Sequence, residues 1–98
     1  MVLYSKHIIL ESEEFDGFLE LEHGKIQGIH KSWEGSYEDY SNCVILPGFI
    51  DIHVHGWATG SFWYEKTEES LRKMCHTLPF SGVTSYLGTT GADSVEEI

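Results

Sequence analysis

Two histidines that are two positions apart, at the end of an apolar run, constrain this chain more than any other feature. They close the run Leu46-Pro47-Gly48-Phe49-Ile50-Asp51-Ile52-His53-Val54-His55-Gly56. Alternate side chains of a β-strand share a face, so a strand here places His53 and His55 on one side, with Asp51 below them. Such a pair predicts two ligands for one metal ion. Two hydrogen-bonded structural histidines are the alternative reading, and Asp51 is expected to have a supporting rather than a ligating role.

Composition narrows the classes of partner. The 98 residues include 16 acidic and 6 basic side chains, for a net charge of -10. Nucleic acids and anionic membranes require clustered Lys and Arg, so neither is an expected partner. Cys43 and Cys75 form no CxxC pattern and are expected to be buried free thiols. We find no secretory signal pattern and no run of 18 apolar residues, which predicts a cytoplasmic, unanchored protein.

Residues 1–46 carry strand patterns. We expect a strand over residues 2–10, and the alternation over 18–22 and 25–29, with His23-Gly24 between them, predicts a tight β-hairpin. The polar, aromatic-dotted stretch 33–42 is expected to connect two structural units. The sequence therefore predicts a small β segment over residues 1–46.

Residues 47–98 have an alternating strand and helix pattern. Pro47 should stand at the start of the histidine strand, and a loop rich in glycine and aromatic residues should follow over 56–65. Thr67 then caps a helix that should bury Leu71, Met74, Cys75 and Leu78 and end at Pro79 and Gly82.

A buried strand is expected over 83–90, parallel to the histidine strand. The two strands and the helix would form a right-handed βαβ unit, so the fold class is α/β. Ser94-Val95-Glu96-Glu97 has the pattern of a capping box, which predicts the start of another helix. A lone βαβ unit leaves bare sheet edges, and we therefore interpret the chain as the amino-terminal, truncated part of a longer protein.

Two segments of the chain carry a family resemblance. Residues 46–56 resemble the first-strand signature of the amidohydrolase superfamily, PGxIDxHxHG, in which both histidines bind metal. Residues 82–90, GVTSYLGTT, are similar to the GxTSxxxTT pattern in the second barrel strand of N-acetylglucosamine-6-phosphate deacetylases. The resemblance implies the start of a (β/α)8 TIM barrel over 47–98, incomplete, preceded by a small β-sandwich segment over 1–46.

What the resemblance implies about function is metal-dependent deacetylation of N-acetylglucosamine 6-phosphate to glucosamine 6-phosphate and acetate. His53 and His55 would bind zinc or iron, and the family resemblance also implies a homodimer at full length and a small-molecule substrate. Trp57 and the aromatic residues at 62–64 would then wall a sugar pocket or simply pack, and Thr89 and Thr90 would line the pocket mouth. The general acid/base and the remaining ligands are expected beyond Ile98.

Other interpretations stay open at this point. A dihydroorotase-like cyclic amide hydrolase shares the HxH signature, and only the second-strand pattern and the aromatic loop argue against it. A small non-enzymatic metal-binding or interaction module, completed by a partner chain, is a different class. A structural β/α domain without a ligand is the third.

The fragment interpretation makes a direct prediction about activity. The 98-residue chain alone should not deacetylate N-acetylglucosamine 6-phosphate, because two histidines cannot complete a four-coordinate metal site. Release of the primary amine from the sugar phosphate, measured with the purified chain and added zinc or iron, checks this. Turnover above the rate of a buffer blank would contradict it.

Overall fold

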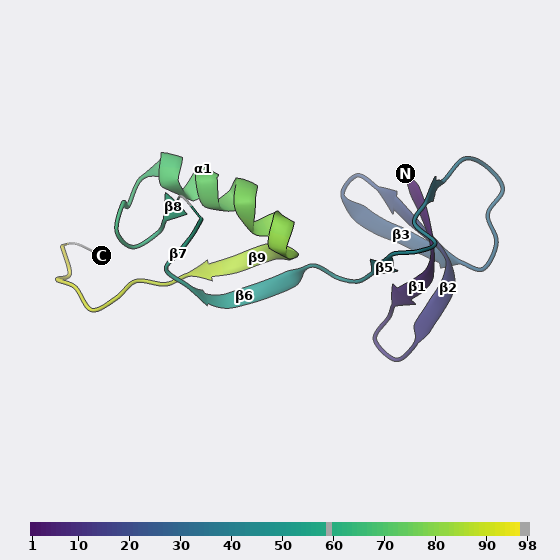
Figure 1. Cartoon of the computed structure of the whole chain (residues 1–98), viewed down its shortest axis with the longest axis horizontal. Coiled ribbons are helices and arrows are strands. Elements are labelled where there is room, and N and C mark those ends of the chain that lie inside the picture. The colour runs from purple at the N-terminus through teal and green to yellow at the C-terminus, as the bar shows by residue number, and fades with distance from the viewer. Residues whose placement is uncertain (59, 97–98) are drawn as a thin grey trace. The chain divides into compact units, whose positions relative to one another are not determined.

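The computed structural model describes residues 1–58 and 60–96, and the chain divides into two compact units, Met1–Pro47 and Gly48–Ile98 (Figure 1). Each unit is described separately below. No helix in the described part of the chain is long and apolar enough to cross a lipid bilayer.

The first unit is a five-stranded sheet in the order β3-β2-β1-β4, in which β5 also pairs with β1. β1 and β2 are antiparallel, as are β2 and β3, whereas the short strands β4 and β5 run parallel to β1. The strand bounds are β1 Val2–Ile9, β2 Glu14–Glu22, β3 Lys25–His30, β4 Glu38–Asp39 and β5 Val44–Ile45.

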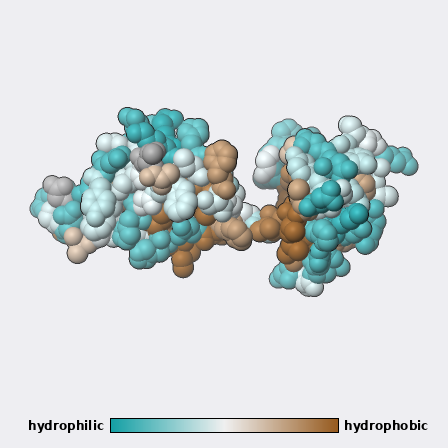
Figure 2. All heavy atoms as spheres, in the orientation of Figure 1, coloured by the Kyte–Doolittle hydropathy of each residue, from teal (hydrophilic) through white to brown (hydrophobic). Residues whose placement is uncertain are grey.

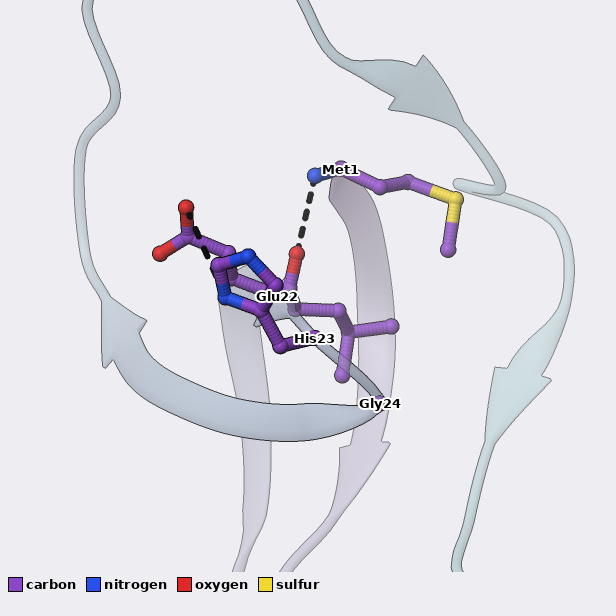
Figure 3. Close-up of a pocket in the computed structure, with 5 residues that line it drawn as sticks. Met1, Glu22, His23 and Gly24 are labelled. Atoms are coloured by element: carbon purple, nitrogen blue, oxygen red, sulfur yellow. Dashed lines mark hydrogen bonds and ion pairs between the residues drawn. The ribbon is translucent and has the colours of Figure 1, made fainter.

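The predicted hairpin is confirmed as β2 and β3. His23 and Gly24 lie between the strands with φ angles of 51° and 72°, the left-handed values that a two-residue hairpin turn requires. Beside this turn is a surface hollow lined by Met1 and by residues 21–24 (Figure 3). The Met1 ammonium donates to the Leu21 carbonyl at 2.8 Å, and the Leu21 N–H donates to the Met1 carbonyl at 2.8 Å. The chain start is thus fixed to β2.

Two expectations for this unit are wrong. The stretch 33–42 is not only a connection, because β4 within it pairs with β1. Cys43 is exposed rather than buried. Its carbonyl takes the inward position instead and accepts a hydrogen bond of 2.6 Å from the hydroxyl of Ser5, which is fully buried. The core of the unit is formed by Val2, Ile8 and Leu19.

The second unit contains the expected βαβ arrangement. β6 and β9 are parallel neighbours, and the helix α1 lies over one face of the pair (Figure 1). Val54, Met74 and Leu78 form the core between them, with Phe62, Val83 and Tyr86 packed at its edge. The bounds are β6 Phe49–Val54, β7 Gly56–Trp57, β8 Gly60–Ser61, α1 Glu68–Thr77, the 3-10 helix η1 Leu78–Ser81 and β9 Val83–Gly88. Further strands of a barrel are not among the described residues.

Both ends of α1 follow the sequence signals. The Thr67 hydroxyl accepts a 3.2 Å hydrogen bond from the N–H of Ser70 and satisfies one of the free N–H groups of the first turn. Pro79 falls within η1, and Gly82, where φ is 81°, is the capping residue that follows η1. A left-handed residue in this place favours glycine, because a side chain there would be strained.

The buried face of α1 differs from the expected one. Ser70, Met74 and Leu78 are buried, Leu71 is partly buried, and Cys75 is exposed. The reason is the hairpin of β7 and β8, in a stretch that we expected to be a loop. Its Gly60 lies against the helix so closely that a Cβ there would be 2.5 Å from the Ser70 carbonyl oxygen, and the Ser70 hydroxyl donates to the Ser61 carbonyl at 3.0 Å.

Cys75 instead lies beside β9. Its sulfur is 3.6 Å from the hydroxyl oxygen of Tyr86. This hydrogen bond, together with partial burial, raises the pKa of Tyr86. The thiol therefore belongs to the rim of the contact between the helix and the sheet rather than to its centre.

The expectation that 83–90 is a buried strand is also wrong for the described residues. Leu87 on β9 is 61% exposed, and Ile50 and Ile52 on β6 are 68% and 74% exposed. Figure 2 shows hydrophobic atoms of this unit gathered on the side opposite α1. The reason is that α1 covers only one face of the pair. Of the expected capping box, Val95 and Glu96 form a turn, and Glu97 lies outside the described residues.

The core of the second unit predicts how a truncated side chain affects its stability. Met74 is fully buried, so Met74→Ala should lower the free energy of unfolding by about 2–5 kcal/mol, through lost burial and the cavity left behind. Urea unfolding followed by the helical circular dichroism signal measures the change. Phe80→Ala is the matched control, because Phe80 is 92% exposed. Equal destabilisation by both substitutions would contradict the assigned core.

Candidate functional site

The two histidines of the signature lie together at the end of β6. The Nε2 atoms of His53 and His55 are 3.2 Å apart, and the ring centroids are 5.0 Å apart with an interplanar angle of 78°. His53 is on the strand and exposed, whereas His55 follows the last strand residue and is partly buried. Two imidazole nitrogens that bind one zinc ion at about 2.1 Å lie no more than about 4.2 Å apart. The observed separation fits this limit.

His55 is held by the residue that follows the end of β9. Its Nδ1 lies 2.8 Å from the carbonyl oxygen of Thr89. A carbonyl can only accept, so Nδ1 carries the proton of a neutral ring and the lone pair is on Nε2. The Thr89 N–H donates to the Val54 carbonyl at 2.9 Å, and the Thr89 hydroxyl accepts from the Val54 N–H at 3.2 Å. Two hydrogen bonds thus fix Thr89 against Val54, and a third joins Thr89 to the His55 ring.

The other expected site residues have distinct positions. The Asp51 carboxylate accepts a hydrogen bond of 3.0 Å from the backbone N–H of His53. Trp57 is on β7 and 44% exposed, and Thr90 is partly buried directly after Thr89. Of the three proposed pocket residues, Thr89 is the one for which the described part of the chain shows a hydrogen bond to a signature histidine.

Within residues 1–58 and 60–96, no three His, Cys, Asp or Glu side chains gather closely enough to hold a metal ion. In the first unit, His30 Nε2 lies 2.9 Å from a carboxylate oxygen of Glu20, and His7 contacts Glu14. His76 is exposed on α1. The pair at the end of β6 therefore supplies two donors, and a complete site needs further ligands.

An aromatic stack lies next to the histidines. The ring of Trp63 is 5.2 Å from that of His55 at an interplanar angle of 45°, and the Tyr64 ring is stacked on Trp63 at 4.8 Å and 28°. The backbone N–H of Trp63 donates to the His55 carbonyl at 3.2 Å, and that of Tyr64 donates to the Ser61 hydroxyl at 2.9 Å. The stack is therefore anchored to the backbone of His55 itself.

Two glycines, Gly88 at the end of β9 and Gly91 after it, make room for this loop, a role that the sequence patterns did not reveal. A Cβ at Gly88 would lie 3.0 Å from the ring of Phe62, and a Cβ at Gly91 would overlap the ring of Trp63. The spacing of aromatic residues at 62 and 63 and glycines at 88 and 91 was the available signal. This spacing can be interpreted only when the loop is known to fold over the end of β9.

An ion pair also joins the loop to the segment after β9. The Lys66 ammonium lies 3.2 Å from a carboxylate oxygen of Asp93. The Ser94 backbone N–H, and secondly Lys66, hold the pKa of Asp93 below its usual value. Both side chains are about one-third exposed, so the pair contributes little to stability, and its role is to connect the two segments.

The comparisons with known proteins find similarity to one class of enzyme, a deacetylase of an amino-sugar phosphate. The chain is 36% identical over 91 residues to the N-acetylglucosamine-6-phosphate deacetylase of Bacillus subtilis strain 168, with 85% of this chain aligned. It spans 22% of the length of that relative. No family model matches the chain. The predicted resemblance to these deacetylases is confirmed at the level of sequence similarity.

The close packing of Trp63 predicts the effect of a single methyl group. Gly91→Ala should push the Trp63 ring away from His55, because the new Cβ would occupy the position of the ring. The His55 ring resonances, shifted by the neighbouring indole, should then move in a proton–nitrogen NMR spectrum. Ala92→Ser, at an exposed neighbouring position, is the control. Unchanged His55 resonances in Gly91→Ala would contradict this packing.

Proposed function

We propose that this chain supplies two metal ligands, His53 and His55, to a hydrolase that deacetylates N-acetylglucosamine 6-phosphate. The observation that carries the proposal is the 3.2 Å separation of the two Nε2 atoms at the end of a strand. The chain that holds them is similar, over 85% of its own length, to an N-acetylglucosamine-6-phosphate deacetylase. The arrangement at the end of a parallel strand is also where β/α barrels place their active sites. The barrel itself is part of the proposal.

The donor set fits a transition metal of intermediate softness. Neutral imidazole nitrogens suit zinc and iron, the two metals that we propose. The Thr89 carbonyl orients His55 by accepting from Nδ1, the kind of outer hydrogen bond that fixes the tautomer of a ligating histidine. Asp51 has an analogous supporting role for His53, through the backbone of its strand. A bound divalent ion lowers the pKa of water and polarises an amide carbonyl.

Two imidazoles do not complete a four-coordinate site. In our proposal the other ligands, the general acid/base and the phosphate-binding groups lie outside the described residues. The proposal also includes a small-molecule substrate and a cytoplasmic homodimer. Cys43 and Cys75 are free thiols, which supports a reducing compartment.

The metal proposal is tested with the product of the complete reading frame that contains this sequence. Loss of a residue that only orients a ligand lowers metal affinity or activity by roughly 10–100-fold. Substitution of a ligand itself should lower them by more than this. His53→Ala and His55→Ala should therefore each lose metal, measured by elemental mass spectrometry, and deacetylation, measured by amine release from N-acetylglucosamine 6-phosphate.

His76→Ala is the matched control, because His76 is exposed on α1 and should keep full metal content and turnover. Two results would overturn the proposal. One is unchanged metal content in both His53→Ala and His55→Ala. The other is a metal-loaded wild-type enzyme that does not release amine from the sugar phosphate.

A further inference from the structure

We infer that Tyr64, stacked on Trp63, is the platform that binds the pyranose ring of the substrate beside His53 and His55. The inference rests on the proposed function for the identity of the sugar, and it adds the residue that recognises the ring. It starts from an unusual exposure, because Tyr64 is 78% exposed. A large aromatic side chain that is fixed in place yet exposed is available for a ligand.

The stack is held rigidly relative to the histidines. The loop backbone is bonded to the His55 carbonyl by the Trp63 N–H at 3.2 Å and by the Ser61 hydroxyl at 3.3 Å. On the other side, the Ser70 hydroxyl of α1 accepts from the Ser61 N–H at 2.5 Å. The loop is thus tied both to the end of β6 and to the helix. A ring that must present a sugar at a fixed place next to two ligands needs this pre-organisation.

The layered order of the rings assigns the roles of the two aromatic residues. Trp63 has one neighbour in His55, at 5.2 Å, another in Tyr64, at 4.8 Å, and contacts Gly91. It is therefore the support. Tyr64 is the outermost ring of the stack, at 28° to Trp63, and presents the surface to which a ligand has access.

The chemistry of the ring selects a sugar. A pyranose has a face of C–H groups whose hydrogens carry a small positive charge, and the face of an aromatic ring is negative. This contact needs no hydrogen bond and leaves the hydroxyl, amide and phosphate groups of the sugar available to other residues.

The test uses the product of the complete reading frame, with a cyclic and an acyclic substrate. Contacts between aromatic faces and their partners are worth about 0.5–1.5 kcal/mol, which is about a three- to tenfold change in affinity. Tyr64→Ala should therefore raise KM for N-acetylglucosamine 6-phosphate by about three- to tenfold with little change in kcat. It should not raise KM for N-acetylethanolamine O-phosphate, which keeps the amide and phosphate but has no ring.

Matched variants separate stacking from other effects. Tyr64→Phe keeps the ring and should recover most of the lost affinity, and Phe80→Ala removes an aromatic side chain that is 92% exposed elsewhere in the same unit and should leave KM unchanged. Equal losses in Tyr64→Ala for both substrates, or equal losses in Tyr64→Phe and Tyr64→Ala, would overturn the inference.

Direct binding distinguishes this inference from the proposed function. Calorimetric titration of the same variants with glucosamine 6-phosphate needs no turnover. If the wild type binds this sugar, and Tyr64→Ala weakens binding about three- to tenfold, the platform stands even where deacetylation is absent and the proposed function fails. If deacetylation is present and Tyr64→Ala binds the sugar as tightly as the wild type, the platform fails and the proposed function stands.

Discussion

The hydrogen bonding between Thr89 and the end of β6 is the interaction on which the candidate site depends. Thr89 pairs with Val54 through its N–H and its hydroxyl, and with the His55 ring through its carbonyl. The same residue therefore ends the pairing of the two parallel strands and sets the tautomer of a candidate ligand. Because the βαβ unit brings residue 89 to residue 54, the chemistry of His55 depends on the crossover through α1.

Much of this framework is local and could be predicted from the sequence. The two-residue period of a strand brings His53 and His55 to one place, although His55 lies just beyond β6. Thr67 and Gly82 mark the two ends of the helical segment through backbone groups within a few residues, and the turn at His23-Gly24 depends only on its own φ angles. Such signals need no knowledge of distant residues.

The features that sequence patterns missed all depend on contacts between distant segments. Apolar spacing assigned Cys75 to the buried face of α1, whereas the structure buries Ser70 there. A buried serine became possible because the hairpin of β7 and β8 supplies both a donor and an acceptor for its hydroxyl. Burial of a polar group costs little when its hydrogen bonds are satisfied, but the partner is not visible in the helix sequence.

The same reasoning explains why the aromatic loop and the histidines form one unit. An exposed loop would ordinarily sample many conformations, and the free energy of ordering it must be offset by its contacts. Here the stabilising contacts include the main-chain hydrogen bond to His55. They also include the packing of the Phe62 ring on Gly88 and of the Trp63 ring on Gly91. Because Gly88 ends β9 and Gly91 lies three residues further on, the strand that positions Thr89 against His55 also positions the surface on which the rings lie. A displacement of β9 along β6 would therefore disturb both the hydrogen bond of Thr89 to the His55 ring and the glycine surface against which the aromatic rings pack.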